Sequence, residues 1–154
     1  AVFADGAQSA WTHVVLSVIG GQGSDTTYQF YVNGSAVTTS VILAVSSVNH
    51  KLFDSGSNNL YIGGNNINGS LTGPLTGHID EFSLHDGALT SGMVTAIYNS
   101  GVAIDLTQAS GDYDVPHRMK LYYRFENNAN DDGSAGSNGA LAADALYSTA
   151  ITPP

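Results

Sequence analysis

Short runs in which apolar and polar residues alternate recur along the chain, and turn-forming residues separate them. Residues 11–19, WTHVVLSVI, are apolar on both faces in the middle of the run, as expected for a central strand. Residues 59–64, NLYIGG, and 77–86, GHIDEFSLHD, predict two further strands joined by the Asn- and Gly-rich loop 65–74. Several short strands with turn signals between them are typical of an all-β sandwich or barrel.

The clearest local signal is a β-hairpin at residues 27–40. Its first strand, TYQFYV, alternates regularly between two faces. Asn33 and Gly34 follow directly, and these two residue types tolerate the positive φ angles that a tight hairpin turn requires. We therefore expect two antiparallel strands joined at this dipeptide.

Residues 89–101, LTSGMVTAIYNSG, depart from the β pattern because their apolar residues recur at helical spacing. Leu89, Met93 and Ile97 follow one another four residues apart, so they share one face of a helix. A Thr-Ser pair can cap the start of this helix, and a glycine can close its end. The sequence predicts one short helix near residues 90–99.

Two more strands are predicted at residues 118–126 and around residues 145–151, with the glycine-rich loop 127–140 between them. The first strand carries three of the four cations of the chain on one face. This face comprises Arg118, Lys120, Tyr122 and Arg124. Its cations either pair with nearby acids such as Asp112 and Asp114, or form a contact face for an acidic partner or another copy of this chain.

The 154 residues suffice for one domain with a sizeable core, and the composition narrows the classes of function. A net charge of −9 argues against nucleic acid and anionic lipid as partners. The net negative charge keeps the protein soluble, or it favours the binding of divalent cations and cationic surfaces. The absence of cysteine excludes disulfides and thiolate chemistry, and the apolar runs are too short for membrane insertion.

The segment HIDEFSLHD places two adjacent carboxylates, Asp80 and Glu81, in an apolar run. Glycoside cleavage needs two carboxyl groups about 5 to 10 Å apart across the scissile bond. Neighbouring strand residues point to opposite faces, so this pair is unsuited to that task, and Glu126 has no acid two residues to either side. The G-x-S-x-G and H-E-x-x-H motifs are also absent. We therefore expect no enzyme.

On this interpretation Asp80 ties a loop to the core and Glu81 faces the other way. Asp80→Ala should then lower stability, by about 1 to 3 kcal/mol if the carboxylate is buried. Glu81→Gln should leave stability nearly unchanged.

Taken together, several motifs resemble a known family. In order, they are WTHVVLSV, YVNG, LYIGG, GHIDEFSLHDGALT and AIYNSG. Their order is similar to that in laminin G-like jelly rolls of the concanavalin A-like lectin and glucanase superfamily. The resemblance covers roughly Trp11 to Leu106. It implies a two-sheet antiparallel jelly-roll sandwich over residues 1–154, with the short helix as its only helical element.

The resemblance also shows a rearrangement. Such domains usually have strands ahead of the W-x-H strand, whereas residues 121–141 resemble the opening segment of the family placed at the end. Three explanations stay open. The missing strands lie upstream in a longer polypeptide, or residues 118–151 supply them in permuted order, or a neighbouring subunit exchanges them. Each would pair or cover an open sheet edge.

The resemblance also implies a function and a cofactor. Laminin G-like domains often bind calcium at one rim, so Asp80 and the loop residues Asn130, Asp131 and Asp132 are candidate calcium ligands. The segment after the helix is similar to tails of laminin G-like domains in bacteriophage virion proteins. We therefore expect a non-catalytic structural or adhesion module on a virion surface, in a capsid decoration, fibre or appendage protein. Its partners would be other virion proteins, copies of itself or a surface glycan.

The alternative is a secreted, extracellular lectin module that binds carbohydrate with the help of calcium.

Overall fold

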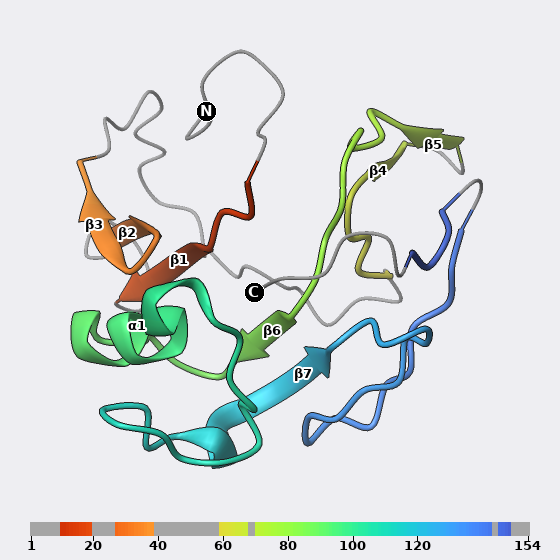
Figure 1. The fold of residues 1–154 in the computed structure, drawn as a ribbon. Coiled ribbons are helices and arrows are strands. Elements are labelled where there is room, and N and C mark those ends of the chain that lie inside the picture. The colour runs from red at the N-terminus through yellow and green to blue at the C-terminus, as the bar shows by residue number, and fades with distance from the viewer. Residues whose placement is uncertain (1–9, 20–26, 39–58, 68–69, 143–144, 149–154) are drawn as a thin grey trace.

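The computed structural model describes residues 10–19, 27–38, 59–67, 70–142 and 145–148 (Figure 1). Within these ranges the strands are β1 (Val14–Ile19), β2 (Thr27–Val32), β3 (Ser35–Val37), β4 (Asn65–Ile67), β5 (Ser70–Thr72), β6 (Phe82–His85) and β7 (Met119–Tyr123). The helix is α1 (Ser91–Tyr98), and 3-10 turns occupy Asn99–Gly101 and Pro116–Arg118. In this part of the chain no helix is long and apolar enough to cross a membrane.

The predicted hairpin is confirmed over residues 27–37, and residues 39–40 of the prediction lie outside the described residues. β2 pairs antiparallel with both β1 and β3, and Leu16 lies opposite Phe30 in the first of these ladders. Asn33 and Gly34 have φ angles of 49° and 76°, the left-handed conformations that match a tight turn to the twist of the two strands.

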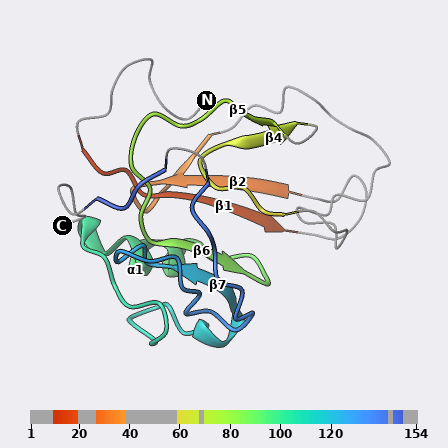
Figure 2. The same ribbon diagram turned by 90° about the vertical axis from the view of Figure 1, so that its right-hand side faces the viewer.

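The β6–β7 pair joins two segments that are far apart in the sequence. Phe82 lies opposite Tyr123, and a register shift separates Leu84 from His85. Figures 1 and 2 show this pair below the β1–β2–β3 sheet, whereas the β4–β5 hairpin lies at the upper right in Figure 1 and above β2 in Figure 2. The described part of the molecule is thus mostly β with antiparallel sheets and one short helix, consistent with a sandwich of the concanavalin A-like type. Its described strands fall in three separate sheets rather than the expected two.

The outer edge of β7 is covered by the loop that follows it. Backbone N–H groups of Asp132 and Ala135 donate to the carbonyl oxygens of Tyr122 and Lys120, both at 2.9 Å. A third such bond runs from Ser134 to the carbonyl of Met119 at the start of the strand, at 3.1 Å. A strand edge satisfied in this way has few free groups left to template pairing with another chain.

The hydrophobic core lies between β2, α1, the segment after the helix and β7. Its buried members are Tyr31, Leu89, Val94, Leu106, Tyr113, Val115, Met119 and Tyr122. Val94, Tyr113 and Tyr122 are fully buried. The segment before α1 is also joined to β1 by a buried hydrogen bond of 3.0 Å from the Ser17 hydroxyl to the Leu89 carbonyl.

The helix is confirmed over Ser91–Tyr98, and its start is capped as expected. The Thr90 hydroxyl accepts a hydrogen bond from the Met93 N–H at 3.3 Å. The end differs from the prediction, because Asn99 adopts the left-handed conformation with a φ of 43° two residues before Gly101. Asparagine is the residue that most often replaces glycine in this role.

Several predicted strand boundaries are wrong. Residues 59–64 form no strand, and the predicted loop 65–74 instead contains the β4–β5 hairpin. The strand predicted at 77–86 begins only at Phe82, and the one predicted at 118–126 ends at Tyr123. Residues 145–148 form no strand, and 149–151 lie outside the described residues.

Left-handed residues account for three of these boundaries. Gly63, Glu81 and Phe125 have φ angles of 78°, 52° and 57°, which an extended strand does not contain.

We expect Gly133→Ala to lower the free energy of unfolding by about 1 to 3 kcal/mol, because the loop packs directly on β7. A Cβ at Gly133 would lie 2.5 Å from the Lys120 carbonyl oxygen. Gly77→Ala is the matched control, since the nearest atom to its Cβ would be Leu75 Cγ at 3.9 Å. Urea unfolding of both variants checks this, and equal stabilities would contradict the packing of loop on strand.

Candidate functional site

The two adjacent carboxylates lie just before β6 rather than inside a strand. Glu81 has a φ of 52°, so the alternation of faces along an extended strand does not apply to it. The interpretation that Glu81 faces away from the core is therefore wrong, and so is the geometric reason for expecting no catalysis. The absence of enzymatic activity itself stays a prediction.

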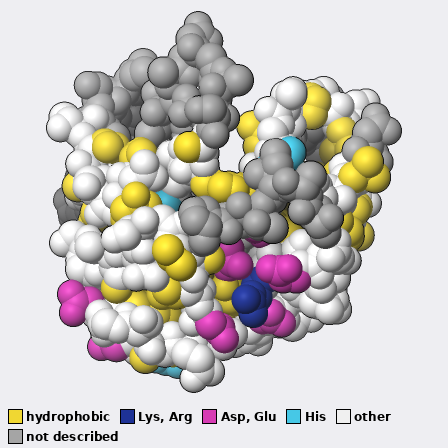
Figure 3. All heavy atoms as spheres, viewed as in Figure 1, with side chains coloured by type: hydrophobic (Ala, Val, Ile, Leu, Met, Phe, Trp, Pro, Cys, Tyr) yellow, Lys and Arg dark blue, Asp and Glu magenta, His cyan; other side chains and the backbone are white. Residues whose placement is uncertain are grey.

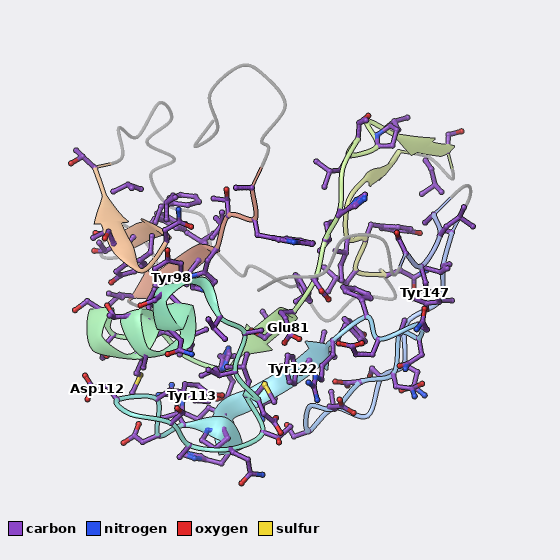
Figure 4. The ribbon with its side chains drawn as sticks, in the orientation of Figure 1. Glu81, Tyr98, Asp112, Tyr113, Tyr122 and Tyr147 are labelled. Atoms are coloured by element: carbon purple, nitrogen blue, oxygen red, sulfur yellow. The ribbon has the colours of Figure 1, made fainter. Side chains whose placement is uncertain are left out.

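Glu81 lies over the fully buried Tyr122 of β7 (Figure 4). The Tyr122 hydroxyl donates a hydrogen bond to Glu81 Oε2 and lies 3.3 Å from the carbonyl oxygen of Ile104. The other carboxylate oxygen of Glu81 is 3.8 Å from Arg124 Nε. One oxygen of this half-buried acid thus accepts a hydrogen bond, and the other lies at ion-pair distance from a cation.

Burial dominates the electrostatics of this group. It raises the pKa of Glu81, although the Tyr122 hydrogen bond and the Arg124 charge favour the ionised form. Burial also raises the pKa of Asp80, whose Oδ1 accepts the N–H of Glu81 at 3.0 Å. The negative charge of Glu126 raises both values further. For Tyr122, burial and the hydrogen bond to Glu81 raise the pKa of the phenol well above its usual value.

This arrangement ties β6 to β7, and it reverses the roles predicted for the two acids. Glu81 contacts a different strand, whereas the hydrogen bond of Asp80 reaches only the next residue. Two surface depressions of the described part have volumes of about 440 and 340 Å³, and neither Asp80 nor Glu81 lines them.

The cationic face of β7 is largely neutralised by acids of the same chain. Arg118 Nε and Lys120 Nζ lie 3.4 and 2.9 Å from the two carboxylate oxygens of Asp86. The alternative that these cations pair with acids is thus the one observed, although their partners are Asp86 and Glu81 rather than Asp112 and Asp114. In Figure 3 the Lys and Arg atoms visible on this face lie among carboxylates.

Tyr122 is fully buried, so its inclusion in an exposed contact face was wrong. Tyr122 instead belongs to the buried hydrophobic core, together with Met119 of the same strand. The Lys120 side chain, with Arg118, instead holds the pKa of Asp86 below its usual value.

Asp131, one of the candidate calcium ligands, holds the loop on β7. Its Oδ1 accepts the N–H groups of Tyr122 and Gly133 at 2.9 and 2.8 Å, and its Oδ2 accepts that of Ser137 at 2.7 Å. Burial opposes ionisation of this carboxyl, but the backbone donors together hold its pKa below the usual value.

The structure does not gather the candidate calcium ligands into a recognisable site. Among the described residues, no group of three or more acidic or His side chains is arranged to hold a metal ion. The charges of Arg124 and Glu126 act on the pKa of Asp80. Asp131 instead accepts hydrogen bonds from the backbone of its own loop and of β7. Calcium binding stays a prediction.

The larger depression lies at a place that the sequence gave no reason to select. It is lined by Asn33, Gly34 and Ser35 of the β2–β3 turn and by Thr95, Ala96, Tyr98, Asn99 and Ser100 at the end of α1. Helical spacing assigned this part of α1 to the core, and nothing in the sequence indicated that the hairpin turn would pack against it.

Residues 4–95 match a laminin G-type family model described as the concanavalin A-like lectin/glucanases superfamily. The match covers more than half of the chain, so the chain belongs to this superfamily. It begins before β1 and ends within α1, which leaves β7 and its loop outside the matched region. No curated protein and no solved structure matched the chain.

Glu81→Ala and Tyr122→Phe should be strongly coupled in stability, because each removes one partner of the same hydrogen bond. We expect a coupling energy of about 0.5 to 3 kcal/mol from a double-mutant cycle measured by chemical denaturation. Tyr123→Phe is the matched control, since its hydroxyl donates to the Ser137 carbonyl instead, at 2.6 Å. Additive effects of Glu81→Ala and Tyr122→Phe would contradict the contact.

Asp131→Asn should lower the free energy of unfolding by about 1 to 3 kcal/mol, because the amide retains only one acceptor oxygen for the N–H donors around it. Asp132→Asn is the control, since Asp132 is exposed and uses its backbone for contact with β7. The pKa of Asp131 is lowered in the fold, so its contribution is complete above its unfolded pKa and is lost as the pH falls through the folded value.

Denaturation midpoints of both variants, measured from neutral to acidic pH, check this. Equal losses in the two variants, or a difference between them that persists in acid, would show that Asp131 does not hold the loop.

Proposed function

We propose that this chain is a non-catalytic adhesion module that attaches to a partner surface without changing it chemically. Membership of the concanavalin A-like superfamily suggests a lectin-like or adhesion module. The absence of catalysis is proposed from the contacts of the Glu81 carboxylate. A general acid or nucleophile needs a carboxylate that reaches the substrate, whereas one oxygen of Glu81 accepts the hydrogen bond of the buried Tyr122 and the other lies 3.8 Å from Arg124 Nε.

We propose further that the module acts on the outside of a virion, in a decoration, fibre or appendage protein. This part rests on the order of the sequence motifs after the helix, which is similar to that in laminin G-like tails of phage proteins. Its partners would be other virion proteins or further copies of the chain. The covered edge of β7 is compatible with a soluble surface module, because it leaves little for uncontrolled strand pairing.

A binding assay that also measures turnover tests this proposal. Immobilised polysaccharides and bacterial surfaces are incubated with the full chain, and both retained protein and released reducing ends are measured. We expect retention on at least one surface with no release of reducing ends, since a Glu81 carboxylate held by Tyr122 does not attack a glycosidic bond.

Two outcomes would contradict the proposal. Release of reducing ends that is lost in Glu81→Gln or Glu126→Gln would show catalysis. Absence of retention on every surface would remove the adhesion function. The same assay with EDTA distinguishes this proposal from the alternative, a calcium-assisted lectin module. Only the lectin module would lose its retention on chelation.

A further inference from the structure

The part of the chain that follows α1, residues 102–142, is called the arm below, and it makes many of its polar contacts within itself. The Tyr113 hydroxyl donates a hydrogen bond to the Leu106 carbonyl oxygen at 3.0 Å. The Asp131 carboxylate holds the loop of the arm on β7 by accepting backbone N–H groups from both. These contacts stay intact when the arm moves as a whole.

The body, which comprises the described residues up to Tyr98, meets the arm along β6. Figure 1 shows β6 and β7 side by side, although the chain between them runs through α1. The polar contacts from the body to the arm come from one short stretch that contains Glu81, His85 and Asp86. His85 Nε2, for example, lies 3.2 Å from the Tyr113 hydroxyl. Apolar side chains of both parts complete the contact in the shared core.

The charges along this contact are sorted by part. The cations lie on the arm, and they are Arg118, Lys120 and Arg124. The acids that pair with them, Asp86 and Glu81, lie on the body. A positive strand segment thus faces a negative one. Every copy of the chain presents the same two acids beside the same strand, so a second copy can receive the arm with the same contacts.

One short connection, Asn99–Gly101, joins the body to the arm and is called the hinge below. Its three residues all have left-handed φ angles, of 43°, 59° and 92° in chain order. This conformation is costly for a residue with a Cβ, so the backbone is strained at Ser100. Two hydrogen bonds between Asn99 and Val102, both of 3.2 Å, close the hinge. Short connections under strain favour exchange between copies, because an extended hinge loses the strain while the other contacts are remade.

We propose that two copies of the chain exchange their arms. The hinge extends, β7 of each copy pairs with β6 of the other, and each arm completes the core of the other copy. The interaction surface is thus the stretch of β6 that carries Glu81 and Asp86, and its partner is the arm of a second copy. This inference rests on the proposed function only in that further copies of the chain are among the proposed partners.

The test is the oligomeric state of the full chain after refolding from urea at micromolar and at millimolar concentrations. Light scattering during size-exclusion chromatography gives the ratio of dimer to monomer. Pairing within one chain has an effective concentration on the order of millimolar, so exchange competes with it in the concentrated sample. We expect a dimer from that sample, and we expect it to persist on dilution, because the arms must leave β6 before monomers form.

Hinge variants assign the dimer to exchange. Gly101→Ala should raise the ratio of dimer to monomer at least about tenfold, because only the closed hinge needs a φ of 92° there. The nearest atoms to its Cβ would be in the Tyr98 ring at 3.9 Å, so the change strains the backbone without a clash.

Gly136→Ala is the matched control for Gly101→Ala. Gly136 also has a left-handed φ, of 61°, and no atom lies within 4 Å of its added Cβ, but it lies in the loop of the arm. This variant should leave the ratio unchanged. Ser100→Gly should act in the opposite direction and lower the ratio at least about threefold, because glycine removes the strain from the closed hinge.

A disulfide across the seam distinguishes exchange from a dimer of side-by-side copies. Leu84 and Leu121 lie opposite each other in the β6–β7 ladder, and the chain has no cysteine of its own. Opposite residues of an antiparallel pair have Cα atoms about 4.5 to 5.5 Å apart, within the reach of a disulfide. The oxidised dimer of Leu84→Cys/Leu121→Cys should therefore run as a covalent dimer on a denaturing gel without reductant.

Three results would overturn the inference. The first is a native chain and a Gly101→Ala variant that both stay monomeric after refolding at millimolar concentration. The second is an oxidised dimer that runs as single chains, and the third is an equal change of the ratio in Gly101→Ala and Gly136→Ala. Surface retention by a chain that never exchanges would leave the adhesion function intact, whereas exchange without retention on any surface would do the reverse.

Discussion

The antiparallel pairing of β6 with β7 is the contact on which most of the described core depends. It brings Met119 and Tyr122 against α1 and the segment that follows the helix, and both side chains are buried there. The polar group of Tyr122 would be costly in this position without a partner, and Glu81 provides one. The loop after β7 then completes the structure, because Asp131 fixes it to the outer edge of the strand.

This pairing also defines how the chain relates to its superfamily. The matched region ends within α1, yet β7 lies beyond it and pairs with β6 inside it. The structure thus places a C-terminal segment beside a strand of the family region within one chain. A permuted order of strands would require pairing of this kind. A strand from an upstream segment or from an exchanged subunit would compete with β7 for the edge of β6.

The features that the sequence predicted well are those with local causes. The Asn33-Gly34 turn follows from residues that tolerate positive φ, and the Thr90 cap follows from a hydroxyl three residues before its donor. The boundary at Glu81 could not be foreseen, because a glutamate rarely adopts a left-handed conformation, and here tertiary contacts accompany it. Those contacts come from Tyr122 and Arg124 on a strand distant in sequence.

The candidate sites show the same contrast between features with local causes and features that depend on distant parts of the chain. The acids of the HIDEFSLHD segment were visible in the sequence, but their roles depended on a partner strand that the sequence did not assign. The depression beside Tyr98 depended on the packing of a hairpin turn on a helix end, which periodicity does not predict.

Hydrogen–deuterium exchange of the full chain, resolved by residue, tests the central pairing most directly. If β7 and its loop are integral to the domain, the amides of Tyr122, Asp132 and Ala135 exchange as slowly as the paired amides of β1 and β2. If these three amides exchange rapidly while β1 and β2 stay protected, the C-terminal segment is not part of the folded unit, and the account given for Glu81 and Tyr122 fails with it.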